Sequence, residues 1–285
     1  MPNTLTFFDR ISQTLDQMFK AESKSAILTS GSGTWNGVKT VRIPTITTQS
    51  LGNYSRVTGY PDGDITVSLK DYTPEYDRGV KFTYDAMDND EVAGLLLAQT
   101  LPEFERTRVI PELDAYRFSL YVNSITNSDN VISLGGATTG AAVLEAILQI
   151  KTVMDDNEIP EMNRHLFLTS EIYNQLIGTN VYTALIDPTA SKGGFQTITS
   201  VPKTRLYKDI TLQSTPNDLT YLVDYPFAGL AVFGESVYQE IKHQVSPLIQ
   251  PEFNATHDGY IQKFRVYAAN GVYANKTDGI VLLDF

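Results

Sequence analysis

Apolar residues recur at helical spacing from residue 87 to residue 121, the longest such stretch in the chain. A first stripe contains Leu97, Leu101 and Phe104, and a second contains Val109, Leu113, Tyr116 and Leu120. In an unbroken helix the second stripe is rotated by roughly 120° from the first. Pro111 lacks an amide hydrogen and disfavours helical angles at Ile110. The pattern therefore predicts a long helix with a kink or restart between Arg108 and Pro111, each half facing its own partner.

The predicted helix begins near Asp88, because Asp88 and Glu91 have the spacing of a capping box that satisfies amide donors at a helix start. At 1.5 Å per residue the stretch spans ~50 Å, longer than the core of an ordinary domain needs. Three pairs of opposite charge are expected to lie exposed along it: Glu103 with Arg106, Arg108 with Glu112, and Asp114 with Arg117. Exposed pairs contribute roughly a few tenths of a kcal/mol to a monomer, so their orientation across a subunit boundary is expected to matter more.

Residues 1–20 also show helical spacing, which predicts an amphipathic arm. Its apolar positions are Leu5, Phe8, Ile11, Leu15 and Met18 or Phe19. Residues 21–37 are small and polar, the composition of a linker. Two interpretations stay open. The arm either reaches another subunit or an assembly partner, or forms the first helix of the chain's own core.

Residues 38–48 and 65–69 alternate between apolar and polar positions, which predicts two strands, with Pro44 at an edge or bulge. The segment between them is rich in turn-forming residues, so the two strands form a long hairpin. Each arm extends on the order of 35 Å, and a two-stranded ribbon of that length is not stable alone in water. The ribbon is therefore expected to lie on another surface, either that of its own domain or that of a neighbour.

A third strand at 80–84 leads into the long helix. The stretch 136–248 predicts one domain of mixed helix and sheet, preceded by a short strand at 131–134. Its expected strands are 164–169, 198–207, 210–212, 221–223 and 230–233; its expected helices are one that opens at 135–140 and runs to about 154 and one at 170–177, with a flexible loop at 187–194. Residues 260–282 predict two further strands around 268–271, which return to the sheet beside the long helix.

Composition narrows the possible partners. The chain has 285 residues, a net charge of −11 and a pI near 4.7, which argues against a protein that grips nucleic acid through phosphate contacts. The absence of cysteine excludes disulfides and thiolate chemistry and fits a cytosolic folding compartment. No apolar run approaches the ~20 residues of a bilayer span, and no signal peptide is apparent, so a soluble, unexported chain is expected. The 16 Tyr and 13 Phe residues favour assembly, because interfaces are rich in aromatic side chains.

No residue pattern indicates a catalytic centre, a cofactor or a metal site. His165, His243 and His257 lack the spacing of short metal-ligand motifs. The acidic clusters at 88–91 and 155–158 lack the spacing of a calcium loop and are expected to be solvated helix ends. The glycine-rich segment 135–140 departs from the phosphate-binding glycine patterns, so a plain helix start is expected there. No nucleophile elbow occurs, although 33 acidic residues always leave some carboxylate pair available for an acidic hydrolase.

Five segments, in order along the chain, resemble tailed-bacteriophage major capsid proteins of the Hong Kong 97-like fold. They are WNGVKTVRIP at 35–44, YDRGVKFTYDAMDNDE at 76–91, ERTRVIPELDAYRFS at 105–119, VPKTRLY at 201–207 and YIQKFRVYAANGVYANKTDGIVLL at 260–283. The resemblance implies an α+β fold with an N-terminal arm (1–37), an extended E-loop hairpin (38–75), a peripheral domain (76–135) with a spine helix at about 88–121, an axial domain (136–248) and a return to the peripheral domain (249–285).

The same resemblance implies a structural, non-enzymatic shell protein with no cofactor. Copies are expected to form pentamers and hexamers of an icosahedral head around double-stranded DNA, which is packaged without sequence-specific binding and without a membrane. By analogy with the family, a portal protein is a partner, and a separate scaffolding protein is implied unless an N-terminal segment has been removed. The expected location is the virion, with assembly in the bacterial host cytoplasm.

Subunit contacts are expected at the hairpin tip and along the spine helix. The residues predicted to make them are Arg56, Tyr60, Asp62, Arg106, Arg108, Glu112 and Arg117. Some members of the family join an E-loop lysine to a neighbour's asparagine, but the tip from Leu51 to Asp64 has Arg56 and no lysine. Such cross-links are therefore not expected. Two other functions are left open: an encapsulin-like compartment for cargo enzyme, and the acidic hydrolase.

Overall fold

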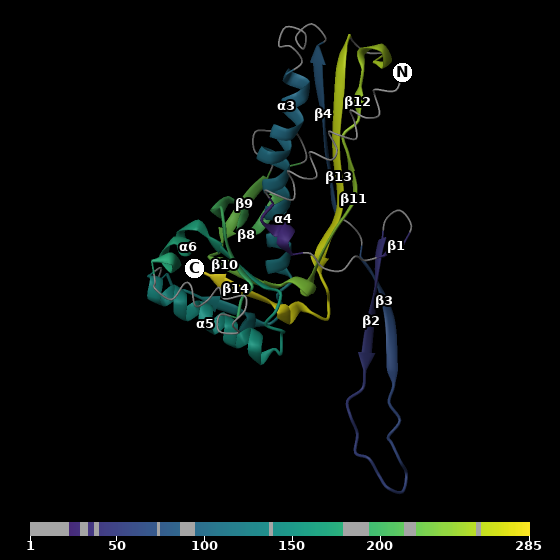
Figure 1. Cartoon of the computed structure of the whole chain (residues 1–285), viewed down its shortest axis with the longest axis vertical. Coiled ribbons are helices and arrows are strands. Elements are labelled where there is room, and N and C mark those ends of the chain that lie inside the picture. Colours follow the sequence, from purple (N-terminus) through teal and green to yellow (C-terminus); the bar gives the residue numbers. More distant parts are fainter. Residues whose placement is uncertain are drawn as a thin grey trace.

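The computed structural model of the chain describes residues 23–28, 34–36, 40–72, 75–85, 95–136, 139–178, 194–213, 221–254 and 258–285. Within these ranges a long helical rod connects two packed regions, and a two-stranded hairpin extends away from both (Figure 1). The predicted arm helix at 1–20, the helix start near Asp88 and most of the predicted loop at 187–194 lie outside the described residues.

The rod consists of α3 (Leu95–Phe104), a π-helical turn (Glu105–Val109) and α4 (Ile110–Asn123). The π-helical turn ends at Val109, two residues before Pro111, so the helix is irregular close to the predicted position. A π-helical turn adds one residue to the helix. The extra residue compensates for the rotation between the two apolar stripes. Leu101 and Phe104 of the first stripe and Val109, Leu113 and Tyr116 of the second consequently pack in the same cluster. Leu120, the last residue of the second stripe, packs instead on a second cluster that contains Phe118 and Phe167. The expectation that each half of the rod faces its own partner is therefore wrong for these five residues, whereas Leu120 does face a different cluster.

A long sheet covers the stripe side of the rod (Figure 1). It contains β4 (Tyr76–Asp85), β11 (Val237–Val245), β12 (Leu248–Ile249) and β13 (Gly259–Val272). The strands β4 and β13 are antiparallel over ten rungs, from Gly259 opposite Asp85 to Ala268 opposite Tyr76. Alternate side chains of β4 are more buried, beginning with Tyr76, and Val80 joins the same apolar cluster as the rod. The sheet therefore has one face on the rod and one face exposed.

The second region is a mixed five-stranded sheet between helices. Its strands, in spatial order, are β5 (Val131–Ser133), β14 (Ile280–Asp284), β10 (Gly229–Phe233), β6 (Arg164–Thr169) and β7 (Thr197–Val201). One face packs on α5 (Gly140–Asp156) and α6 (Ser170–Ile177), through residues such as Leu166 and Ala231. The other face packs on α4, where Phe167 lies 5.0 Å from Phe118 between ring centroids. Strands covered on both faces read as continuous apolar runs, which explains the sequences of β6 and β10.

Two smaller sheets complete the architecture. The strands β8 (Tyr207–Leu212) and β9 (Tyr221–Pro226) pair beside α4, where Ser119 Oγ and Asn123 Nδ2 donate to the carbonyl of Lys208 at 2.6 and 2.9 Å. The hairpin sheet contains β1 (Thr34–Asn36), β2 (Thr40–Thr48) and β3 (Ile65–Tyr72). β1 occurs where the sequence pattern predicts only a linker.

The last part of the chain differs from its sequence prediction. The strand β13 runs without interruption through 268–271 and ends at Val272, and a turn follows at 273–279. As expected, β13 lies in the sheet beside the rod, but β14 lies in the five-stranded sheet. The strand β11 was not predicted, because its charged and polar residues weaken the alternation on which strand prediction depends. The residues of β11 form a strand because they pair with β13, and this pairing is not visible in the local sequence pattern.

His165 lies buried in β6, where its neighbours are polar. Its Nδ1 contacts Thr197 Oγ1 at 2.8 Å and its Nε2 contacts Asn163 Oδ1 at 2.9 Å. Burial lowers the pKa of this imidazole below its ordinary value of 6.5. Unfolded chains therefore take up a proton as the pH falls through 6.5, whereas the folded chain does so only at lower pH. The free energy of unfolding is expected to be highest above this pH and to decrease below it.

The prediction can be measured by urea unfolding of subunits between pH 7.5 and pH 5. His165→Gln keeps polar atoms at the site but has no titrating group, so its unfolding free energy should change less over the same range. Equal pH dependence in both proteins would contradict the assignment to His165.

Candidate functional site

The hairpin carries an apolar face that no described residue of its own subunit covers. Ile46 lies opposite Val67, and Ile65 and Leu69 are on the same side of the ribbon. We call Ile46, Ile65, Val67 and Leu69 the apolar face of the hairpin; their exposed fractions lie between 59% and 67%. The opposite side of the ribbon presents Thr47, Thr66 and Ser68. A ribbon with one apolar and one polar side has the pattern of a strand pair that is covered on one side.

The tip of the hairpin has an internal structure of its own. Ser55 and Gly59 exchange two backbone hydrogen bonds, and Ser55 Oγ accepts from the amides of Val57 and Thr58. Gly59 has a φ of +84°, which a residue with a side chain adopts only with strain. Tyr54 and Tyr60 contact each other with ring centroids 4.9 Å apart. The tip is therefore a preformed turn.

Large apolar side chains project from this turn into solvent. Leu51, Val57 and Tyr60 are 102%, 93% and 86% exposed. Because the turn is held by its own hydrogen bonds, little further ordering is needed when these side chains meet a partner. A preformed apolar tip on an extended ribbon is suited to insertion between other protein surfaces.

An aromatic stack joins the base of the hairpin to the long sheet. Tyr72 at the end of β3 contacts Tyr238 of β11, with ring centroids 4.9 Å apart, and Tyr238 contacts Tyr273 at 5.4 Å. The hydroxyl of Tyr72 accepts from the amide of Ala274 at 3.4 Å. Burial raises the pKa of Tyr238, so its hydroxyl is neutral at physiological pH. The stack fixes where the hairpin leaves the body.

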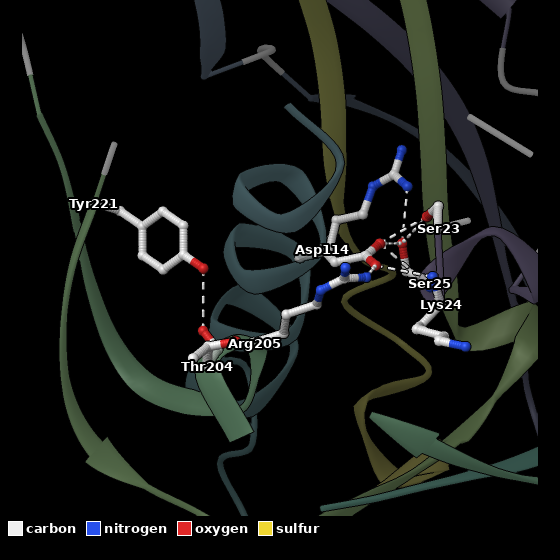
Figure 2. Close-up of polar contacts among 8 residues, drawn as sticks. Ser23, Lys24, Ser25, Asp114, Thr204, Arg205 and Tyr221 are labelled. Carbon is white, nitrogen blue, oxygen red and sulfur yellow. Dashed lines mark hydrogen bonds and ion pairs between the residues drawn. The ribbon is translucent and has the colours of Figure 1, made fainter. Parts of the chain in front are cut away.

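A buried carboxylate on α4 holds the start of the described chain. Asp114 is fully buried, and Figure 2 shows it between Arg205 and the segment Ser23–Ser25. It accepts hydrogen bonds from Ser23 Oγ and Ser25 Oγ, both at 2.6 Å, and from the amide of Lys24 at 2.8 Å. Arg205 Nη1 lies 2.9 Å from its second oxygen. One side chain of the rod thus joins two segments that are distant in sequence.

Arg117 extends this buried network. Its Nε donates to Asn270 Oδ1 of β13 and its Nη1 to Ser25 Oγ, both at 2.9 Å. Burial lowers the pKa of this guanidinium, and the nearby Tyr121 and Asp114 oppose that shift. Gln239 Nε2 completes the network by donating to Tyr121 Oη at 2.8 Å and to the carbonyl of Ser25 at 3.1 Å. The network connects the rod, the long sheet and residues 23–28.

Glu112 is also buried on the rod. It accepts from Tyr76 Oη at 2.9 Å and from Arg78 Nε at 2.8 Å, both on β4. Burial and the adjacent Glu112 carboxylate raise the pKa of Tyr76 well above its ordinary value. The expectation of three exposed charge pairs on the rod is therefore correct only for Glu103 and Arg106, whose closest nitrogen–oxygen distance is 2.7 Å. Glu112, Asp114 and Arg117 are buried and have partners from other elements.

The residues predicted to contact other subunits fall into two groups. Exposed on the surface are Arg56, Tyr60 and Asp62 at the hairpin tip and Arg106 and Arg108 on the rod. Glu112 and Arg117 are buried within the subunit, so any effect they have on assembly is indirect. The apolar face of the hairpin was not predicted as a site, although residues 65–69 alternate between apolar and polar positions. The network around Asp114 was not predicted because no local pattern marks it.

The expected solvated acidic cluster at 155–158 has a structural contact. Asp155 lies 2.7 Å from Nη1 of the buried Arg164 and 3.0 Å from Lys151 Nζ. Within the ranges described above, no group of three or more His, Asp or Glu side chains is arranged to hold a metal ion. None of the described helices combines the length and apolar character needed to cross a bilayer.

The chain is similar in fold to several solved structures. The chain is similar to the capsid structure of the cyanophage P-SCSP1u, with 14% identity, a TM-score of 0.66, and coverage of 90% of this chain and 86% of that chain. It is similar to a structure from Microbacterium phage Oxtober96, with 14% identity, a TM-score of 0.63, and coverage of 92% and 91%. A virus-like particle from Pyrococcus furiosus matches with 8% identity, a TM-score of 0.56, and coverage of 98% and 99%.

No protein-family model matches the chain. No curated protein matches it by sequence. The likeness therefore concerns the fold, which is that of tailed-phage capsid proteins over most of the chain. The α+β class and the Hong Kong 97-like fold predicted from the sequence are confirmed.

Proposed function

We propose that this chain, which has the fold of tailed-phage capsid proteins, is the major capsid protein of an icosahedral head that encloses phage double-stranded DNA. The observation that carries the proposal is the uncovered apolar face of the hairpin, together with the exposed apolar tip. Burying an exposed Val, Leu or Ile side chain contributes about 1.5–3 kcal/mol of favourable free energy. Covering the four residues of this face therefore strongly favours association. A second copy of the chain can supply the missing cover in a closed, symmetric shell.

The division of the chain into arm, E-loop, peripheral and axial domains belongs to the same proposal. The long sheet with the rod corresponds to the proposed peripheral domain, and the five-stranded sheet with α5 and α6 to the proposed axial domain. Because β11 pairs with β13 and β14 pairs with β10, the chain passes between the two regions more often than a single return after residue 248 provides.

In this role the chain performs no chemical turnover, and its partners are other proteins and packaged DNA. Self-association into pentamers and hexamers is primary. A portal protein and a separate scaffolding protein are proposed as further partners, with assembly in the host cytoplasm. The net charge of −11 suits a wall that must not bind DNA tightly.

Negative-stain microscopy and light scattering of the expressed chain test the proposal. Closed shells, partial shells or capsomer rings are expected. A compact monomer at every concentration and salt condition would count against a capsid role.

A compartment that encloses a protein cargo is a second candidate, favoured by the likeness to the virus-like particle from Pyrococcus furiosus. The two functions differ in what particles from native cells contain. After nuclease treatment of the exterior, a phage capsid should release protected double-stranded DNA, whereas a compartment should release a protein guest.

A further inference from the structure

The exposed face of the long sheet carries a pair of lysines in an unusual position. Lys81 of β4 lies directly opposite Lys263 of β13, and both are exposed. Directly opposite side chains in an antiparallel pair have Cβ atoms about 4.5–5.5 Å apart, and like charges there are destabilising. Among the described residues, neither Lys81 Nζ nor Lys263 Nζ has a hydrogen-bond or ion-pair partner. We call these two residues the lysine rung.

The neighbouring cation on this face, Arg265, has an acidic partner. Arg265 is two residues from Lys263 on the same side of β13, and it is paired with Asp77 through Nε at 2.8 Å and Nη2 at 2.6 Å. Within the part of the chain that the structure describes, one of these three adjacent cations is therefore neutralised and the other two have no counter-charge. In a chain with 33 acidic and 22 basic residues, two such lysines on one rung mark a place for an anionic partner.

The hairpin tip offers the complementary charge. Asp62 and Asp64 flank Gly63 and are exposed, and no contact of either carboxylate is found within the described part of the chain. In Figure 1 the hairpin and the β4–β13 pair extend in opposite directions from their common base. The tip of one subunit is therefore remote from its own lysine rung, and a contact between them requires two copies.

Another acidic pair exists, on the body of the subunit. Asp209 of β8 lies directly opposite Asp224 of β9, and both are exposed. This pair is part of a short sheet beside α4 and does not project beyond the body. The tip is the better partner because it extends away from its own subunit and ends in a preformed turn.

We propose that the lysine rung of one subunit binds the carboxylates of Asp62 and Asp64 from the hairpin tip of a second copy. This inference rests on the proposed capsid function and assigns the residues that make one of its subunit contacts. The contact directs the tip onto the exposed face of the neighbour's long sheet. The apolar residues Leu51, Val57 and Tyr60 then pack around the charged pairs and exclude water from them.

Charge reversal on each side, and on both sides together, tests the proposal. Lys81→Glu with Lys263→Glu, and Asp62→Lys with Asp64→Lys, should each reduce the yield of closed shells by roughly tenfold or more, because like charges then meet at every copy of the contact. The chain that carries all four substitutions should regain shells. Yield is measured by sedimentation and electron microscopy, and thermal unfolding of the subunits checks that each variant folds.

The acidic pair at Asp209 and Asp224 supplies the matched control. Asp209→Lys with Asp224→Lys should leave shell yield unchanged and should not restore shells when combined with the two Lys→Glu changes. Restoration by this pair instead of by the tip would overturn the assignment.

A contact with DNA phosphates is the other outcome that would overturn it. In that case the Lys→Glu variant forms shells in normal yield and differs only in DNA content. If all charge variants form shells like the parent chain, the lysine-rung contact is wrong and the capsid function stands. If the parent chain forms no assembly, the capsid function itself fails.

Discussion

Removing residues 51–64 is expected to give a subunit that folds normally but does not close into a shell. The tip contacts itself through Ser55, Gly59 and the Tyr54–Tyr60 pair, so its loss removes no core packing from the body. Gln49 and Ser50 then connect the last rung, Thr48 with Ile65, which is the length of a two-residue hairpin turn. Replacing these two residues by Asn-Gly gives the shortened hairpin a favoured turn sequence. Unchanged thermal unfolding with loss of shells is the expected result.

Point substitutions on the ribbon test the contribution of the apolar face to assembly separately from that of the tip. Val67→Glu places a charge on the apolar face, where burying it without a partner costs several kcal/mol at each contact. Thr66→Glu is the matched control, because the adjacent residue points to the polar side of the same strand. Shells should be lost in the first variant and retained in the second. Normal shells from Val67→Glu, or from the deletion, would refute a bridging role for the hairpin.

Asp114→Ala is expected to cause the largest loss of stability within the subunit. The substitution leaves the side chain of Arg205, which is 14% exposed, and the buried Arg117 without their nearby carboxylate, and removes the acceptor for Ser23 and Ser25. Removing one partner from a buried ionic network costs about 3–5 kcal/mol. Urea unfolding measures the effect. Residues 23–28 should also become more accessible to proteases and to hydrogen exchange, because Asp114 is a principal attachment of this segment.

Glu103→Ala is the control for this prediction. Glu103 is on the same rod and pairs with Arg106, but both side chains are exposed, at 59% and 47%. A pair of this kind contributes roughly 0.2–1 kcal/mol. If the two substitutions changed the free energy of unfolding by similar amounts, the network around Asp114 would not be the anchor of residues 23–28.

Some residues of the candidate site were placed correctly from the sequence, and others were not. The tip residues Arg56, Tyr60 and Asp62 lie exposed on a projecting hairpin, as a role between subunits requires, and that role stays a prediction. For the rod, helical spacing correctly paired Glu103 with Arg106. Spacing alone did not distinguish this exposed pair from Glu112 and Arg117, which have the same i,i+3 or i,i+4 relations but face other elements. Burial depends on what packs against each face, and local spacing does not contain that information.

The sequence by itself determined the elements whose periodicity is local: the β6 strand and the α6 helix, the long rod with its irregularity near Pro111, and the hairpin at 40–72. Tertiary structure decided how they combine. The π-helical turn brings Val109, Leu113 and Tyr116 to the same cluster as Leu101 and Phe104. The strand β14 joins the five-stranded sheet, and Asp114 contacts Ser23 and Arg205, each 91 residues away. The physical reason is that periodicity records which face of an element is apolar. The choice of which distant segment covers that face is made only when the whole chain packs.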